Sequence, residues 1–252
     1  MAPDTVSAVT LPEMLAVAGA GAAAGAVNAI VGSGSLITFP TLLAVGYAPV
    51  VANVSNTVGL VFGSISGAWG YRRELRGQWR RVLGLAAGSA TGALVGGILL
   101  LALPGSVFDA VVPVLILIAV ALMAFKPTPR HGAERDHVLP ATGGTFLTGI
   151  YGGYFGAAQG VILLAVLRLA FTDDLQRLNA VKNVLASLAN AVAAVLFVLV
   201  ADVAWEAAAL IAGGSIVGGA LGANLGRRLP EVWLRRIVIV GGTVVAVILI
   251  VD

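Results

Sequence analysis

Cysteine is absent from this chain of 252 residues, and charged residues account for only 11% of it. Without cysteine the protein has no disulfide framework, no thiolate nucleophile and no thiolate metal site. A typical soluble domain carries about 25% charged residues, so this chain lacks the charge that would cover a water-facing surface. The shortage of charge excludes an ordinary cytosolic enzyme and a nucleic-acid-binding protein.

No carboxylate lies in the middle of an apolar segment. Asp109, Asp202 and Glu206 all fall near segment ends. A proton relay built on carboxylates inside a membrane is therefore not expected, although coupling to a small cation through backbone carbonyls stays open. The apolar segments also contain no nucleophile–base pair and no set of metal ligands at the required spacing. We therefore expect no enzyme, no metal and no cofactor.

Apolar residues are what the chain has in abundance: hydrophobic residues make up 59% of it, and the mean hydropathy is +0.99. The apolar runs cover 11–31, 35–47, 49–71, 82–103, 106–125, 140–156, 160–171, 175–201, 204–226 and 237–251. Most reach the length of about 20 residues that a membrane-spanning helix needs. The sequence therefore predicts an all-α integral membrane protein. Residues 1–13 contain no Lys or Arg, so we expect a membrane segment at 11–31 rather than a cleaved signal peptide.

Two of the runs, 35–47 and 160–171, are too short to span a membrane. Each corresponds to about 18 Å of helix, whereas the hydrocarbon core is about 30 Å thick. One follows Gly32-Ser33-Gly34-Ser35 and the other follows Gly156-Ala157-Ala158-Gln159-Gly160. Irregular backbone persists at membrane depth only where protein or water satisfies it. The pattern predicts two re-entrant half-helices, each forming a hairpin with the segment before it.

The basic residues predict the orientation of the chain in the membrane. Arg72, Arg73, Arg76, Arg80 and Arg81 share one loop. The 126–139 stretch, the region after residue 226 and the flanks of the eighth segment carry most of the rest. If both hairpins return to the side they came from, these regions all face one compartment, which the positive-inside rule makes the cytoplasm. We therefore predict a multi-pass protein of the cell (inner) membrane with both termini on the outer side.

The two halves of the chain align with each other at an offset of about 126 residues. Residues 79–104 align with 205–230, residues 52–56 align with 179–183, and the two glycine-rich breaks also coincide after a short gap. Each half would hold one hairpin and three transmembrane helices, an odd number of crossings, so the halves would be inverted. The predicted organisation is a first repeat over 1–125, a cytoplasmic linker over 126–139 and a second, inverted repeat over 140–252. Inverted repeats are the architecture of secondary transporters.

The breaks and the polar residues on the helices after them form a candidate binding site. A half-helix that starts inside the membrane points its N–H groups and positive dipole end at the interior, which suits an anion. Intramembrane amides are expected to face the protein interior. The residues we expect to bind substrate are Asn28, Ser33, Gly34, Ser35, Asn53, Asn56, Thr57, Gln159, Gly160, Asn179, Lys182 and Asn183. Two alternatives stay open: the glycines could serve only close helix packing, and the amides could join helices structurally.

Lys182 is the cation closest to this candidate site. It falls about 12 Å into its segment, against a half-thickness of about 15 Å. A charge at that depth is a functional hypothesis by default. The alternative is that its long side chain extends back to the cytoplasmic headgroups.

At these residues the chain resembles the TauE/SafE family of membrane permeases, often called sulfite exporters. The resemblance rests on residues 25–36 with Pro40 and on 52–57 in the first half, and on 152–160 and 179–183 in the second. It covers essentially the whole chain, although Ser33 and Ala158 stand where the family often has glycine. The family implies movement of sulfite or organosulfonates across the plasma membrane.

The function expected is therefore that of a secondary transporter for a small sulfur oxyanion, bound near the membrane midplane between the two half-helices. A passive anion channel on the same scaffold and a non-transporting membrane interaction subunit are the alternatives. The expected partners are a small anionic substrate and the lipid bilayer, with no nucleic acid, and assembly as a homodimer is left open.

Overall fold

The computed structural model describes residues 10–124, 138–226 and 243, and every regular element in this part of the chain is an α-helix. The first half holds five helices: α1 (Leu11–Ile30), α2 (Ser35–Ala44), α3 (Pro49–Gly70), α4 (Trp79–Ala102) and α5 (Gly105–Ala124). The second half holds four described helices: α6 (Val138–Tyr154), α7 (Gln159–Ala170), α8 (Leu175–Val200) and α9 (Trp205–Leu225). The expected segment at 237–251 and most of the expected linker at 126–139 lie outside the described residues.

Five of the described helices are long and apolar enough to cross a membrane, namely α1, α3, α4, α8 and α9. Helices α2 and α7 are short and apolar. The chain breaks between Ile30 and Ser35 and again between Tyr154 and Gln159. Both predicted breaks are thus confirmed. One boundary differs from expectation: α4 begins at Trp79 rather than near residue 82, so the basic loop is shorter and Arg80 and Arg81 lie in the first helical turn.

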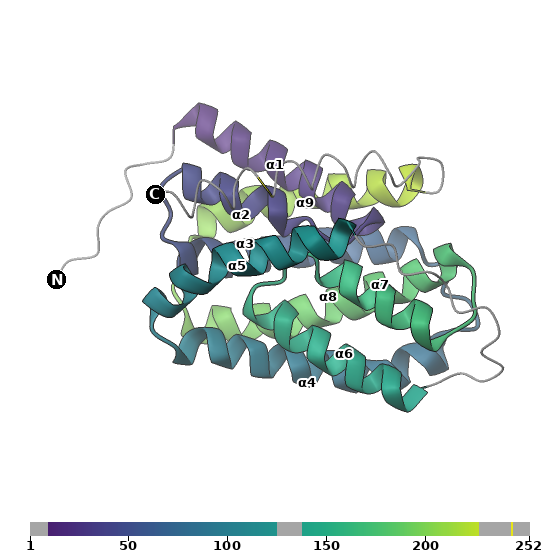
Figure 1. The fold of residues 1–252 in the computed structure, drawn as a ribbon. Helices are drawn as coiled ribbons and strands as arrows, with labels where there is room; N and C mark the ends of the chain where they lie inside the picture. Colours follow the sequence, from purple (N-terminus) through teal and green to yellow (C-terminus); the bar gives the residue numbers. More distant parts are fainter. Residues whose placement is uncertain (1–9, 125–137, 227–242, 244–252) are drawn as a thin grey trace.

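The helices pack as two close pairs around a central pair (Figure 1). Helix α1 lies along α9, α4 lies along α6, and α3 and α8 contact each other between them. Glycine residues allow the close approach of the helices in both pairs. A Cβ at Gly218 would overlap the carbonyl oxygen of Ala22, and a Cβ at Gly92 would overlap that of Phe146. Small residues at such contacts let backbones approach closely, which is the usual way that helices associate in lipid.

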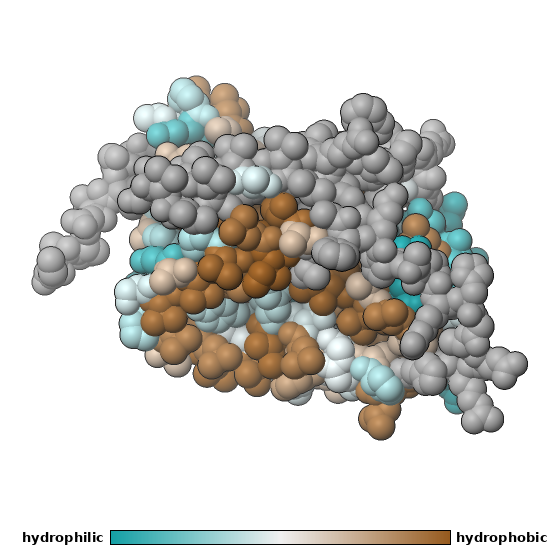
Figure 2. All heavy atoms as spheres, viewed as in Figure 1, coloured by the Kyte–Doolittle hydropathy of each residue, from teal (hydrophilic) through white to brown (hydrophobic). Residues whose placement is uncertain are grey.

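The outward-facing side chains of these helices are apolar. Figure 2 shows a broad hydrophobic surface on the face where α4, α5 and α6 lie. Exposed side chains there include Leu94, Ile98, Leu117, Ile118 and Leu147. An apolar exterior of this size is the pattern of a protein whose solvent is the lipid bilayer.

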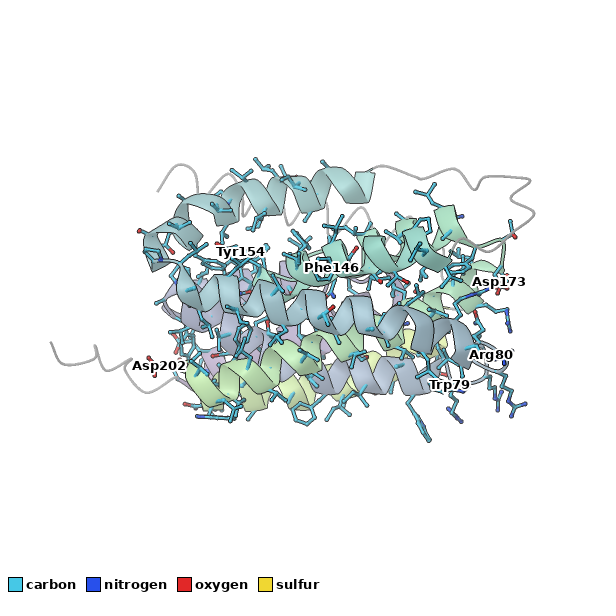
Figure 3. The ribbon with its side chains drawn as sticks, turned by 90° about the horizontal axis from the view of Figure 1, so that it is seen from below. Trp79, Arg80, Phe146, Tyr154, Asp173 and Asp202 are labelled. Carbon is cyan, nitrogen blue, oxygen red and sulfur yellow. The ribbon has the colours of Figure 1, made fainter. Side chains whose placement is uncertain are left out.

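The two ends of the helix bundle carry different charges. Trp79, Arg80 and Asp173 lie at one end, and Tyr154 and Asp202 lie toward the other (Figure 3). We call the first the Arg80 end and the second the Asp202 end. The half-helices fold back as predicted: α1 begins at the Asp202 end and α2 returns to it, whereas α6 begins at the Arg80 end and α7 returns to it (Figures 1 and 3).

Candidate functional site at the two helix breaks

The two helix breaks touch each other in the interior of the protein. The amide nitrogen of Gly160 donates to the carbonyl oxygen of Gly32 at 2.9 Å. Gly32 and Gly156 turn the chain with φ values of +90° and +78°, which glycine adopts without steric cost. Ala158 has a φ of +60° although it carries a Cβ, and this conformation costs about 1–2 kcal/mol in an L-residue.

The backbone N–H groups that begin α7 are not free to bind a ligand. Those of Gln159, Val161 and Ile162 donate to carbonyl oxygens of Gly156 and Ala158, and that of Gly160 donates to Gly32. At the start of α2, the N–H groups of residues 36–38 likewise donate to residues 33 and 34. The N–H groups at these particular positions are therefore already used within the protein.

Three polar side chains of α8 converge on the end of α1, immediately before the first break. Lys182 is completely buried, and its Nζ donates to the carbonyl oxygens of Asn28 and Ala29 at 3.2 and 3.3 Å. Asn183 and Asn179 donate through Nδ2 to the same oxygen of Ala29, at 3.0 and 3.3 Å. The last carbonyls of a helix have no partner within it and carry partial negative charge. The ammonium of Lys182 thus lies beside the break and caps α1, and it does not extend to the membrane surface.

Asn56 of α3 bonds to side chains at the beginning of α2. Its Nδ2 donates to Oγ of Ser35 at 3.1 Å, and its Oδ1 accepts a hydrogen bond from Oγ1 of Thr38. All three side chains are buried. Thr38 was not among the residues predicted from the sequence, although it lies one helical turn after Gly34 on the same half-helix. That spacing was a usable signal.

Asn53, one turn before Asn56, connects α3 to the second break. Its Nδ2 donates to the carbonyl oxygen of Tyr154 at 2.9 Å, at the end of α6. Thr57 donates to the carbonyl oxygen of Asn53 at 2.9 Å, so its hydroxyl is used within α3. The side chain of Gln159 lies against Gly152 of α6, where a Cβ would overlap it. The first break is therefore bonded by polar side chains of both halves, and the second by Asn53 of the opposite half.

Several buried polar atoms around the breaks have no hydrogen-bond partner in the described part of the chain. Two are donors, Oγ of Ser33 and Nε2 of Gln159, and two are acceptors, Oδ1 of Asn53 and Oδ1 of Asn179. Leaving a buried polar group unpaired costs about 1–3 kcal/mol, and each such group in a folded protein calls for an explanation. Ser33 and Gln159 flank the contact between Gly32 and Gly160, one from each break.

Asn28 lies at the edge of this region and is half-buried. Its Nδ2 donates to Oγ of Ser64 at 3.0 Å, and Asn190 of α8 donates to the same oxygen at 3.2 Å. Ser64 thus joins α1, α3 and α8. It was missed in the sequence, but it lies two turns after Thr57 on the same face of α3.

The comparisons with known proteins decide the family. Residues 17–249 match the family described as "Sulfite exporter TauE/SafE". This chain belongs to the TauE/SafE family. It is 29% identical over 229 residues to a "Probable membrane transporter protein" of Haemophilus influenzae, covering 87% of this chain and 88% of that protein.

Two further relatives carry similar names. The "Probable membrane transporter protein ORF9" of a Sinorhizobium species is 28% identical over 234 residues, covering 91% of this chain and 89% of the relative. The "Probable membrane transporter protein YfcA" of Escherichia coli K12 is 27% identical over 237 residues, covering 91% and 86%. No solved structure gives a significant match. The protein is a multi-pass membrane protein of a transporter family, as the apolar helices of this TauE/SafE chain also indicate.

An ion-pair network joins the two halves of the TauE/SafE chain at the Arg80 end. Asp173, in the loop between α7 and α8, accepts from Arg81 at 2.8 Å and from Arg177 at 2.9 Å. Burial raises the pKa of Asp173. Hydrogen bonds from Arg81, from the Asp174 amide and from Arg177 together lower the pKa by more than burial raises it, so the pKa lies below its ordinary value. The guanidinium of Arg81 also lies 4.4 Å from the centroid of the Phe171 ring.

Proposed function

We propose that this TauE/SafE protein is a plasma-membrane secondary transporter, and not an enzyme, that carries a small sulfur oxyanion such as sulfite or an organosulfonate. The single observation that carries the proposal is the pair of unpartnered buried donors, Ser33 Oγ and Nε2 of Gln159, one at each of two helix breaks that touch. An oxyanion supplies the acceptors that these donors lack. Lys182, which caps α1 beside the first break, supplies positive charge.

The transport role rests on an inverted-repeat arrangement, which several contacts support. Helices α3 and α4 begin at Pro49 and Trp79, and α8 and α9 begin 126 residues later, at Leu175 and Trp205. The contacts between halves also correspond with the roles exchanged: Gly25 packs against Ser215, and Gly149 packs against Ser89. Helices α1 and α6 run in opposite directions (Figures 1 and 3). Such repeats bind substrate where their broken helices meet and transport it by rocking against each other.

The charge distribution supports an orientation with the Arg80 end in the cytoplasm. The loop from Tyr71 to Gln78 and the first turn of α4 carry the exposed Arg72, Arg73, Arg76 and Arg80. Under the positive-inside rule this end faces the cytoplasm, and α1 then begins on the outer side of the inner membrane. Within this proposal, residues 1–125 form the first repeat, 126–139 the linker and 140–252 the second repeat.

Flux into proteoliposomes tests the proposal. We expect saturable uptake of sulfite or a two-carbon sulfonate by the full chain, above that of phosphate. Replacing Ser33 by Ala or Gln159 by Leu should lower apparent affinity about tenfold, since a hydrogen bond to a charged group is worth about 1.5–3 kcal/mol. The matched control is Thr91→Ala, because the exposed Thr91 hydroxyl donates only within its own helix.

Three outcomes would contradict the proposal. Flux that rises linearly with concentration would indicate a passive channel. No flux of any sulfur anion above that of empty liposomes would indicate a non-transporting subunit. Equal losses in Thr91→Ala and in the two site variants would show that the breaks are not where the substrate binds.

A further inference from the structure

We propose that a pocket between the ends of α3 and α9 binds the phosphate group of an anionic phospholipid. The pocket has a volume of about 270 Å³ and lies at the Arg80 end, away from the helix breaks. Its lining comes from the last turns of α3, the residues directly after it and the last turns of α9: Ser66, Trp69, Gly70, Arg72, Arg73, Ala220 and Asn224.

The charges of the pocket lining suit a phosphate. Arg72 and Arg73 contribute two guanidinium groups, and no carboxylate is among the lining residues that the structure describes. Arg72 is held in place from two directions: its NH1 donates to the carbonyl oxygen of Trp69 at 3.1 Å, and its guanidinium lies 5.3 Å from the centroid of the Trp69 ring. A positioned guanidinium presents a planar fork of donors that matches phosphate oxygens.

The surroundings of the pocket favour a lipid over a free anion. Trp69 is 70% exposed, and an exposed indole at a helix end belongs at the level of the lipid headgroups. Exposed apolar side chains continue from the pocket toward the middle of the bundle, Phe62 and Ile65 on α3 and Val217 and Leu221 on α9. Phe62 shares a helical face with Ser66 and Trp69, and Val217 shares one with Ala220 and Asn224. An acyl chain attached to a bound headgroup would lie along this apolar surface.

The level of the pocket in the membrane agrees with this assignment. The loop from Tyr71 to Gln78 leads directly into α4, where Trp79 and Arg80 mark the end of the bundle (Figure 3). A basic pocket between spanning helices at this level is a recognised type of site for anionic headgroups. Neither the transported anion nor the helix breaks enter the argument, so this proposal is independent of the transport proposal.

Lipid binding by the purified full chain in neutral detergent tests the inference. We expect phosphatidylglycerol, measured by native mass spectrometry, to bind at least about tenfold more tightly than phosphatidylcholine. The double substitution Arg72→Gln with Arg73→Gln should weaken phosphatidylglycerol binding by at least about tenfold. The matched control is Arg76→Gln with Arg80→Gln, which removes the same charge from exposed positions at the same end but outside the pocket. It should leave the affinity within about twofold of the parent.

Each other outcome overturns the assignment. Equal weakening by both double variants would mean that general positive charge attracts the lipid, and no weakening by Arg72→Gln with Arg73→Gln would mean that it binds elsewhere. Inorganic phosphate that displaces the lipid and binds as tightly would make the pocket a site for a soluble anion. All four arginines are described and none is buried, so both variants should fold, which their unchanged melting temperatures would verify.

Discussion

The amide of Gly160 and the carbonyl oxygen of Gly32, 2.9 Å apart, join the two helix breaks main chain to main chain. A Cβ on either glycine would overlap the backbone of the other. The contact therefore requires glycine on both sides. Because the breaks come from opposite halves of the chain, any movement that separates the two breaks would have to break this hydrogen bond.

Gly32→Ala should impair both folding and transport. The substitution adds a Cβ where φ is +90° and where the backbone of Gly160 leaves no room. We expect a loss of stability of about 2–5 kcal/mol, from left-handed strain of about 1–2 kcal/mol together with overpacking of about 1–3 kcal/mol. Thermal unfolding in detergent and flux in proteoliposomes measure the two effects.

Gly46→Ala separates strain from overlap. Gly46 has a similar φ of +100°, but nothing lies within 4 Å of the added Cβ. This control should lose only the strain of about 1–2 kcal/mol and should keep its flux. If Gly46→Ala and Gly32→Ala melt at the same temperature, the contact between the breaks contributes nothing to stability.

Lys182→Gln should weaken substrate binding by about tenfold or more, because an interaction with a charged group is worth about 1.5–3 kcal/mol against about 1 kcal/mol for a neutral one. The contacts with Asn28 and Ala29 add a second expectation, a lower melting temperature, since the ammonium also caps α1. Lys182→Arg should keep part of the affinity, because the charge survives and the geometry does not. Binding is measured as the concentration dependence of flux.

Two controls distinguish charge at the breaks from charge or hydrogen bonding elsewhere. Arg168→Gln removes a half-buried cation in the last turn of α7, and Ser55→Ala removes a buried acceptor of the Ala204 amide at the Asp202 end. Neither should change apparent affinity, although Ser55→Ala should lower stability. Parent-like affinity in Lys182→Gln, with only a lower melting temperature, would mean that the lysine does no more than cap α1.

The breaks were predictable because their cause is local. A run of about a dozen apolar residues after a glycine-rich stretch cannot span a membrane, and α2 and α7 begin at or within one residue of the predicted positions. The start of α4 was less predictable. The sequence Trp79-Arg80-Arg81 is typical of a basic loop. In the structure these residues form the first turn of α4, and their long side chains extend outward from it.

The sequence alone could not predict which residues of the two halves correspond in the structure. Aligning residues 52–56 with 179–183 places Ser55 opposite Lys182, because this alignment matches Asn56 with Asn183. The helix starts give an offset one residue smaller: Pro49 begins α3 and Leu175 begins α8, so Asn56 corresponds to Lys182. The partners of Lys182 were equally out of reach, because periodicity identifies an inward face but not which helix end lies against it.

Asp173 should make the stability of the protein pH-dependent in the acid range. Its pKa is lowered in the folded state, so the ion pairs with Arg81 and Arg177 contribute fully above the unfolded pKa of about 3.9. That contribution is lost as the pH falls through the folded pKa. Asp173→Asn should lower stability by about 1 kcal/mol at neutral pH and should flatten the acid limb of a plot of melting temperature against pH. Asp202→Asn, exposed at the opposite end, should match the parent; an unchanged acid limb in Asp173→Asn would contradict the assignment.

Gly218→Ala should show how closely the spanning helices must approach. The added methyl would overlap the backbone of Ala22, so α9 must move away from α1 along a contact made of small residues. Overpacking of this kind costs about 1–3 kcal/mol, read as a lower midpoint of thermal unfolding in detergent. Gly213→Ala, in the same helix with nothing within 4 Å of its Cβ, should melt at or above the temperature of the parent, since alanine has a higher helix propensity than glycine.

Gly92→Ala tests the equivalent contact of α4 with α6. Its methyl would overlap the backbone of Phe146, so it should lower the melting temperature as much as Gly218→Ala does. Clearly unequal losses would count against equivalent packing in the two halves, and parent-like melting of both would mean that neither pair of helices is held as closely as these contacts require.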